Sequence, residues 1–182
     1  ANIYGGTFGD PNGNGSGAFV MGTSQSNRGN ANIHGGNFEV GGQAGFSIYN
    51  YANVLFEEQD GRSIVVNGLA CGIALESSAA DYAVKIRSGS FSSHRPSGGD
   101  GSGIWYGSSR CELTIEGGNF TGSLISGLRL DANPNVQISG GTFTGASGGI
   151  SGNAGWTEQN ILVAGYTFNK TNGNRTWTCV QS

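Results

Sequence analysis

The chain has 182 residues, a formal net charge of −3 at pH 7, 35 glycines and only 12% charged residues. Its length fits a single domain, and no cluster of basic residues could follow a phosphate backbone, so we expect no nucleic-acid partner. No apolar run approaches the length needed to cross a bilayer, so we expect no membrane insertion.

One short motif recurs along the chain. It consists of an aliphatic anchor residue, a turn that is usually rich in glycine, and an aromatic residue five positions after the anchor. The six copies run Ile3–Phe8, Ile33–Phe38, Ile86–Phe91, Ile115–Phe120, Ile138–Phe143 and Val163–Phe168. A seventh, degenerate copy enters at Phe56, where residues 57–61 replace the glycine turn before Ile64. Successive anchors lie 23–30 residues apart, which predicts a solenoid of about seven coils.

Each coil should contain three short strands. Apolar residues alternate before each anchor, as in a strand with one buried face. The inward pairs expected there are Val54/Phe56, Val84/Ile86, Leu113/Ile115, Val136/Ile138 and Ile161/Val163. A strand earlier in each coil should bury Phe19/Met21, Phe46/Ile48, Ile73/Leu75, Ile104/Tyr106 and Leu128/Leu130. The residues around the late Phe form the third strand, so the fold class is an all-β parallel β-helix. We expect one domain, residues 1–182, in which 171–182 could serve as a C-terminal capping tail.

Three residue types carry further expectations. The glycine pairs suit a corner with positive φ. Four asparagines, each three residues before an anchor, should stack between coils: Asn30, Asn53, Asn135 and Asn160. The cysteines at 71, 111 and 179 are too scattered for a zinc site, so we expect buried small apolar side chains, with one disulfide and a free thiol as the alternative.

The motif Ile-x-Gly-Gly-x-Phe, as in Ile115–Phe120 and Ile138–Phe143, resembles the repeats of right-handed parallel β-helix proteins. These form the pectate-lyase-like superfamily, and the resemblance is strongest to Gly-rich repeats of extracellular surface proteins. It implies a right-handed coil and an extracellular or cell-surface location. Because the superfamily includes polysaccharide lyases, glycoside hydrolases, tailspikes, adhesins and structural modules, the resemblance leaves the function open.

Inward positions are needed for packing, so a functional site should use outward columns, meaning residues that face outward at the same place in successive coils. The two columns on the early strand are Val20, Ser47, Ala74, Trp105, Arg129, Ser151 and Gly22, Tyr49, Glu76, Gly107, Asp131, Asn153. The candidate ligand-binding residues are Tyr49, Glu76, Trp105, Arg129 and Asp131. The aromatic side chains could stack on a glycan, and two carboxylates about 10 Å apart could serve inverting hydrolysis. Alternatively, this is a solvated face with loose ion pairs.

A second candidate is the outward column Glu57, Arg87, Glu116 on the anchor strand, whose charges alternate in sign. The simpler interpretation is a set of cross-strand pairs that stabilises the sheet. The functional interpretation is a lyase-like site with a basic residue, in which calcium could bind near Glu57, Glu58 and Asp60, although no calcium-loop spacing is present. We expect no other metal or cofactor.

Small polar residues flank the late Phe in two rows. The rows are Thr7, Asn37, Ser90, Asn119, Thr142, Thr167 and Gly9, Glu39, Ser92, Thr121, Thr144, Asn169. Regular hydroxyl rows of this kind are used by ice-binding proteins, although Glu39 interrupts them.

The leading hypothesis is a non-catalytic extracellular β-helix module for adhesion, glycan contact or structural self-assembly. The alternatives are a polysaccharide lyase or glycoside hydrolase acting on an extended glycan, and an ice-binding protein. The expected partners are a polysaccharide or cell-surface glycan, and other copies of the chain through end-to-end association or a trimer, because the first coil begins without a cap.

Overall fold

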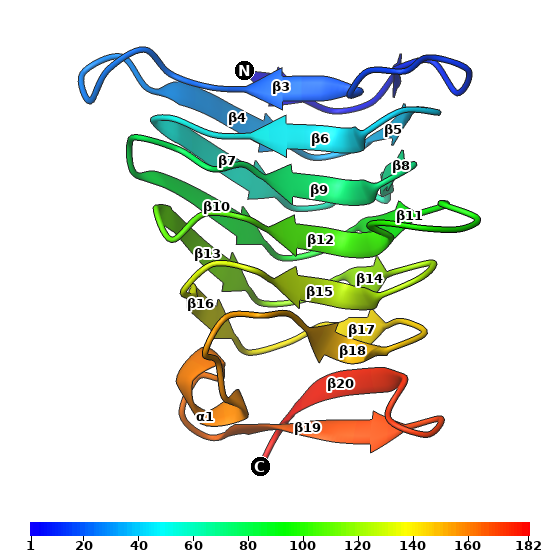
Figure 1. Cartoon of the computed structure of the whole chain (residues 1–182). Helices are drawn as coiled ribbons and strands as arrows, with labels where there is room; N and C mark the ends of the chain where they lie inside the picture. The colour runs from blue at the N-terminus through cyan, green and yellow to red at the C-terminus, as the bar shows by residue number, and fades with distance from the viewer.

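The computed structural model describes residues 1–182 and shows a parallel β-solenoid built from three sheets (Figure 1). Sheet A contains β1 (Asn2–Ile3), β4 (Gly29–Ile33), β7 (Ala52–Phe56), β10 (Tyr82–Ile86), β13 (Cys111–Ile115) and β16 (Asn135–Ile138). Sheet B contains β2 (Thr7–Phe8), β5 (Gly36–Glu39), β8 (Ile64–Gly68), β11 (Ser90–Ser93), β14 (Asn119–Thr121), β17 (Thr142–Thr144), β20 (Thr176–Gln181) and β19 (Tyr166–Thr171). Sheet C contains β3 (Ala18–Val20), β6 (Ala44–Ile48), β9 (Cys71–Leu75), β12 (Ser102–Tyr106), β15 (Ser126–Leu130) and β18 (Gly148–Ser151).

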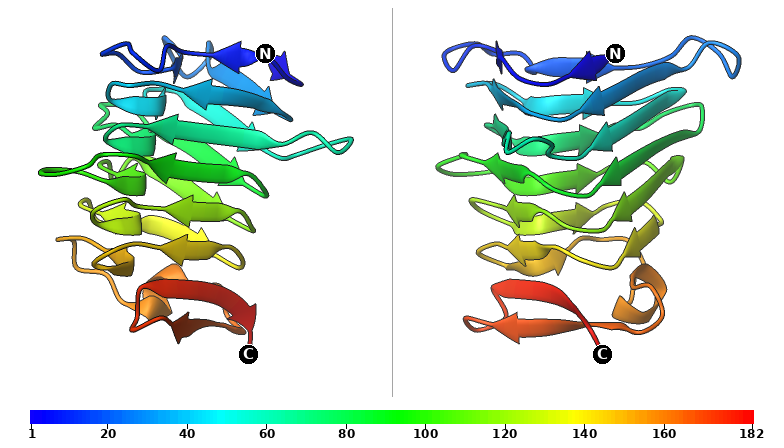
Figure 2. Two further views of the ribbon diagram at one scale, coloured as in Figure 1. Left: turned by 90° about the vertical axis from the view of Figure 1, so that its right-hand side faces the viewer. Right: turned by 180° about the vertical axis from the view of Figure 1, so that it is seen from behind.

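The chain visits sheets A, B and C in turn, which confirms three strands per coil. Seen from the N-terminal end, it runs clockwise as it descends, so the solenoid is right-handed like nearly all parallel crossovers (Figures 1 and 2). Each of the three sheets stacks six parallel strands, so the chain passes through six levels and completes about five full turns. Seven coils were expected. The difference lies at the C-terminal end.

Aromatic side chains stack along the interior of sheet B. The rings of Phe91 and Phe120 lie 5.3 Å apart and those of Phe120 and Phe143 lie 4.9 Å apart, both nearly parallel. The third coil has Val66 in this column. Phe56 on sheet A supplies the missing ring, because its edge contacts bridge Phe46 and Phe91. The degenerate coil therefore keeps the interior filled with a ring from another sheet.

Glycine allows the tight corner between sheets A and B. The second glycine of the pair has φ of +113° at Gly6, +128° at Gly36, +103° at Gly118 and +97° at Gly141. A Cβ is strained in this region, so the repeat depends on glycine there. The predicted positive φ is confirmed.

The asparagine stack forms only in part. Asn53 donates a hydrogen bond to Asn30 at 3.0 Å between side chains on neighbouring coils. The next coil places Ala83 beside Asn53, and Asn135 lies beside Glu112. Asn160 instead completes a capping box with Thr157 at the start of the helix α1 (Glu158–Ile161).

The expected register of the first coil is wrong by one residue. Ala18 and Val20 pair with Phe46 and Ile48 and face inward, whereas Phe19 is 61% exposed and Met21 is 47% exposed. All four residues from 18 to 21 are apolar. The alternation therefore does not specify which face is buried, and a shift by one residue exchanges the faces.

The seventh coil is replaced by a cap (Figure 1). After β18 the chain forms α1, whose Ile161 is buried, and Leu162 rather than Val163 bridges to Ile138. The chain then forms the antiparallel hairpin of β19 and β20, and β20 pairs with β17. Residues 157–160 lack the apolar alternation of a strand and carry helix-capping side chains instead, so the expected Ile161/Val163 pair is wrong. The helix, at four residues, is too short to cross a membrane.

The cysteines agree with the main expectation. Cys71, Cys111 and Cys179 are all buried and none forms a disulfide. Burial raises the pKa of the Cys71 thiol to about 12. The thiols therefore act as small apolar side chains.

Candidate functional site

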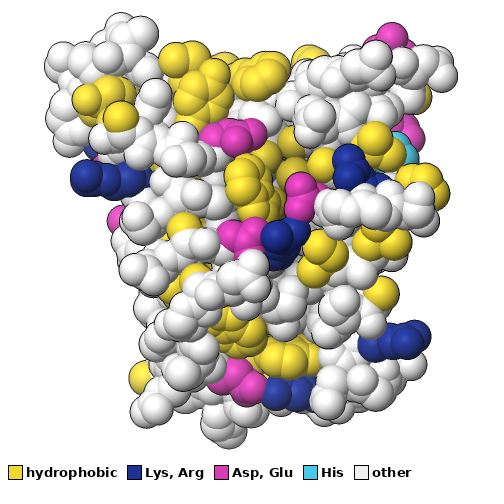
Figure 3. All heavy atoms as spheres, in the orientation of Figure 1, with side chains coloured by type: hydrophobic (Ala, Val, Ile, Leu, Met, Phe, Trp, Pro, Cys, Tyr) yellow, Lys and Arg dark blue, Asp and Glu magenta, His cyan; other side chains and the backbone are white.

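The outer face of sheet C brings together most of the predicted ligand-binding residues. The register places Ser47, Ala74, Trp105, Arg129 and Ser151 in one column, with Phe19 rather than Val20 above them. In the next column Glu76, Gly107 and Asp131 follow the ends of β9, β12 and β15. Figure 3 shows hydrophobic side chains with acidic ones around them over these strands.

The indole of Trp105 is held against the sheet. A Cβ on Gly107 would lie 2.6 Å from its Cζ2 and 2.7 Å from its Cη2, so the ring occupies the space above this glycine. Its Nε1–H donates a hydrogen bond to Asp131 Oδ2 at 3.1 Å. The side chain also packs against the small buried side chains of Ala44, Cys71 and Ala74. These contacts on several sides fix the orientation of the ring.

A hollow of about 230 Å³ lies beside this indole. It is lined by Gln43, Ala44, Ala70, Cys71, Ala74, Glu76, Asp100 and Trp105. Glu76 takes part in none of the ion pairs of the molecule. The side-chain hydrogen bond that reaches its carboxylate comes from the Ser47 hydroxyl at 3.4 Å. Its charge is therefore available to a ligand.

The other carboxylates of this face are bound to Arg129. The guanidinium Nε lies 2.7 Å from Asp131 Oδ2, and Nη1 bonds Asp100. Asp131 Oδ2 thus forms an ion pair with Arg129 and accepts the hydrogen bond from Trp105. Asp131 positions the indole, whereas Glu76 faces the hollow. Tyr49 follows β6, one coil before Glu76, and does not line the hollow.

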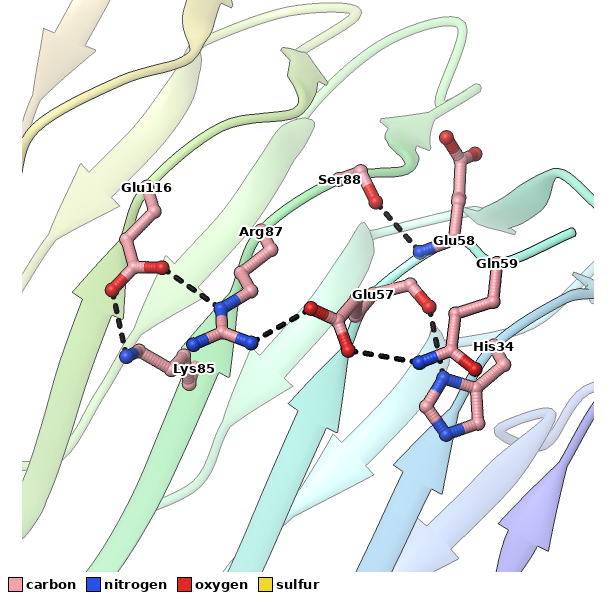
Figure 4. A network of polar contacts seen from close by, with 8 residues as sticks. All are labelled: His34, Glu57, Glu58, Gln59, Lys85, Arg87, Ser88 and Glu116. Atoms are coloured by element: carbon pink, nitrogen blue, oxygen red, sulfur yellow. Dashed lines mark hydrogen bonds and ion pairs between the residues drawn. The ribbon is translucent and has the colours of Figure 1, made fainter. Parts of the chain in front are cut away.

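The second candidate column forms a continuous ladder of ion pairs (Figure 4). Arg87 reaches Glu57 at 2.7 Å and Glu116 at 2.9 Å, and Lys85 reaches Glu116 at 2.6 Å. The hydrogen bond from Arg87 lowers the pKa of Glu57, and Lys85, with Arg87 next, lowers that of Glu116. Every charge in this ladder has a partner of opposite sign.

The acids of the degenerate coil point to different partners. Glu58 Oε1 accepts a hydrogen bond from the backbone N–H of Ile64 at 2.9 Å, and Asp60 pairs with Arg62 at 3.2 Å. His34 Nδ1 contacts the backbone oxygen of Glu57 at 3.0 Å (Figure 4). The structure brings together no group of three side chains suited to a metal ion here or elsewhere.

The polar rows of sheet B continue into the C-terminal hairpin. Thr142 lies beside Thr178, and Thr144 lies beside Thr176. The expected rows are wrong at their end, because Thr167 lies beside Val180 and Asn169 joins the first row beside Thr178. The antiparallel hairpin reverses the chain direction, so counting from the motif does not give this register. The alternation of Thr176, Trp177, Thr178 and Cys179 was the signal for the missed threonines.

No related protein indicates the role of the three outer faces. Comparison with protein families, curated proteins and solved structures finds no match. The function must therefore be inferred from the chemistry of the residues on these faces.

The sequence prediction missed part of the lining of the hollow. Asp100 belongs to the connection between β11 and β12, where the repeat gives no register. Gln43 and Ala70 come just before β6 and β9. Cys71 was expected only as a core residue. Alternation along β9 assigns Cys71 to the inward side with Ile73 and Leu75, so no sequence signal showed that it lies beside Ala44 at the outer face.

Proposed function

We propose that this protein is a non-catalytic extracellular β-helix module that binds a glycan on the outer face of sheet C. The observation that carries the proposal is the fixed indole of Trp105 beside a hollow with an unpaired carboxylate. Ligand sites combine apolar or aromatic walls with a few placed polar groups. A ring already held in position loses little entropy when a sugar stacks on it.

The scaffold is consistent with this role. Solenoids present extended surfaces to long ligands, and the chain resembles Gly-rich right-handed parallel β-helix proteins of the pectate-lyase-like superfamily. We extend that resemblance to an extracellular or cell-surface location. Adhesion through a surface glycan then requires only the binding face and the rigid coil beneath it.

Two sets of contacts weigh against the hydrolase or lyase alternative. Inverting hydrolysis needs one carboxylic acid and a second carboxylate free to activate water. Asp131 Oδ2 is already engaged, in an ion pair with Arg129 and as the acceptor of the Trp105 hydrogen bond. In the other column, Arg87 is bound between Glu57 and Glu116 and is not free to act as a base. A binding role uses these residues as they are arranged.

A binding assay with a matched variant tests the proposal. The protein would be titrated against a panel of neutral, acidic and amino polysaccharides, and the Trp105→Ala variant would be compared on any ligand that binds. We expect a loss of about tenfold or more, as for a central aromatic contact. The control is Tyr4→Ala, which removes another partly exposed aromatic far from sheet C. Equal binding by wild type and Trp105→Ala would contradict the proposal.

Ice binding is the second candidate, favoured by the extension of the polar rows onto the hairpin. Ten uncharged polar side chains occupy five adjacent strands: Ser90, Ser92, Asn119, Thr121, Thr142, Thr144, Thr176, Thr178, Asn169 and Thr171. They repeat at about 4.8 Å between strands and about 6.6 Å along each strand. A regular array of this kind could order water. Shaping of ice crystals that is lost in Thr142→Lys would support this candidate, and round crystals with the wild type would remove it.

A further inference from the structure

We propose that the hollow beside Trp105 selects glycans that carry protonated amines, such as oligomers of glucosamine without N-acetyl groups, over neutral and acidic glycans. This inference depends on the proposed glycan-binding function, and it names the class of sugar that the same site would take. It follows from the charges around the hollow and from the surfaces that form it.

The charge at the site is negative. Three carboxylates surround Trp105, those of Glu76, Asp100 and Asp131, and the one basic group that pairs with any of them is Arg129. The net charge of this set is −2, because three negative groups face one positive group. Figure 3 shows the acidic side chains of this face beside its hydrophobic patch. An acidic glycan would therefore be repelled.

Glu76 is the carboxylate that a ligand could use. Asp100 and Asp131 share Arg129, whereas the side-chain partner of Glu76 is the neutral Ser47 hydroxyl at 3.4 Å. An ammonium group would give Glu76 a charge-assisted hydrogen bond, which is stronger than a bond between neutral groups. A neutral hydroxyl or an N-acetyl group would gain less from the same carboxylate.

Trp105 adds a second attraction for the same group. The indole and Glu76 line one hollow, so an ammonium bound to the carboxylate also lies near the aromatic ring. A cation close to an indole face is attracted by the ring quadrupole. The carboxylate and the ring therefore both favour a positive charge at this position.

The walls of the hollow suit the body of a sugar ring. Ala44, Ala70 and Ala74 present methyl groups that can contact the apolar C–H face of a sugar. Cys71 adds no charge, because burial raises its pKa to about 12. The volume of about 230 Å³ lies below the roughly 300–1,000 Å³ of sites for drug-sized ligands. The hollow thus fits a single sugar unit, and neighbouring units would extend along the outer face of sheet C.

Calorimetric titration would test the selectivity with three oligomers of equal length. These are glucosamine, N-acetylglucosamine and galacturonic acid oligomers, at mildly acidic pH and low salt so that the amines are protonated. We expect the glucosamine oligomer to bind at least about tenfold more tightly than the acetylated one. The galacturonic acid oligomer should bind most weakly, and added salt should reduce the preference for the amine.

Two substitutions separate the specific site from general attraction to an acidic protein. Glu76→Gln should weaken binding of the glucosamine oligomer and narrow its preference over the acetylated one to what the indole of Trp105 contributes. Glu112→Gln is the matched control, because Glu112 is an exposed carboxylate on the outer face of sheet A. It should leave the preference unchanged. Trp105→Ala should weaken both glucosamine-based oligomers.

The possible failures are distinguishable. If the acetylated oligomer binds as tightly as the glucosamine oligomer and binding depends on Trp105, the amine selectivity is wrong and the glycan-binding function stands. If Glu76→Gln and Glu112→Gln reduce binding equally, the attraction is general and the assignment to the hollow is overturned. If no oligomer binds, the selectivity is wrong, and the polysaccharide panel with Trp105→Ala decides the proposed function separately.

Discussion

Two outward columns of the solenoid carry carboxylates on the same coils but differ in the residue between them. Both have a carboxylate on the third coil and another on the fifth: Glu57 and Glu116 after the strands of sheet A, and Glu76 and Asp131 after those of sheet C. The residue on the fourth coil is Arg87 in the first column and Gly107 in the second. One residue type thus separates a closed ladder of ion pairs from an open site.

The physical reason is the spacing of the coils. Neighbouring coils lie about 4.8 Å apart, so a guanidinium on the middle coil reaches the carboxylates on both sides. Arg87 does this, with contacts of 2.7 and 2.9 Å. Gly107 has no side chain, and the indole of Trp105 lies over it instead. The site therefore requires glycine at position 107, because glycine makes room for the indole ring and leaves Glu76 without a basic partner.

The largest effect is expected when the open column is converted into a closed one by Gly107→Arg. The new side chain would displace the indole and could pair with Glu76 and Asp131, as Arg87 does in the ladder. Glycan binding should fall by about a hundredfold or more, because it loses both the aromatic platform and the free carboxylate. Titration with the best ligand of the panel measures this. Gly155→Arg is the control, because nothing lies within 4 Å of a Cβ at that exposed glycine. Unchanged binding in Gly107→Arg would refute the comparison.

A smaller change at residue 107 tests the effect of the indole position separately from the effect of charge. Gly107→Ala adds one methyl group 2.6 Å from the indole, which must shift, while the charges stay the same. The φ of Gly107 is not in the left-handed region, so the backbone tolerates alanine. We expect about a tenfold loss of binding and little change in the melting temperature. A shift in tryptophan fluorescence, absent from Gly155→Ala, would report the moved ring, and an unaltered spectrum with unaltered binding would show that the ring is not constrained by this glycine.

Much of this geometry could be predicted from the sequence, because the solenoid repeats it. The alternating apolar residues of the second to fifth coils set the register of Trp105 above Arg129 and therefore the outward columns. The first coil was misread because residues 18–21 are apolar on both faces. The cap was missed because α1 and an antiparallel hairpin do not follow the repeat.

The sequence predicted the outward strand residues of the candidate site, but neither their roles nor the residues that the connections contribute. The columns place Glu76 and Asp131 on one face but do not show that Asp131 holds the indole. Asp100 lies in a connection without a repeat, so its contact with Arg129 depends on a loop conformation that no periodic pattern specifies. The pairing of side chains across coils thus decided which carboxylate remained free.

Opening the closed ladder should have a modest effect on stability. Arg87→Ala removes the partner that Glu57 and Glu116 share. Of the ion pairs in the ladder, only the one between Lys85 and Glu116 remains. Because these side chains are partly exposed, we expect the melting temperature to fall by only a few degrees, with less effect at high salt. Glycan binding should not change. Arg110→Ala, which breaks the single exposed pair with Asp81, is the control and should cost less. A fall in glycan affinity in Arg87→Ala would show that the two columns are not independent.

The smallest expected effect is a difference in acid sensitivity. Arg87 lowers the pKa of Glu57 below its ordinary value of 4.5, and Lys85 and Arg87 lower that of Glu116. A carboxyl whose pKa is lower in the folded state stabilises the fold above its unfolded pKa, and this contribution is lost as pH falls through the folded value. The wild type should therefore lose its advantage over Arg87→Ala as the pH falls from about 5 to about 3. Melting curves of both proteins across that range measure the difference in stability. The carboxyl groups outside the ladder are the same in both proteins, so their contributions cancel in this difference. If the melting temperatures of the two proteins change with pH in parallel, protonation of Glu57 and Glu116 is not linked to folding. The ladder would then differ from the open column only in geometry.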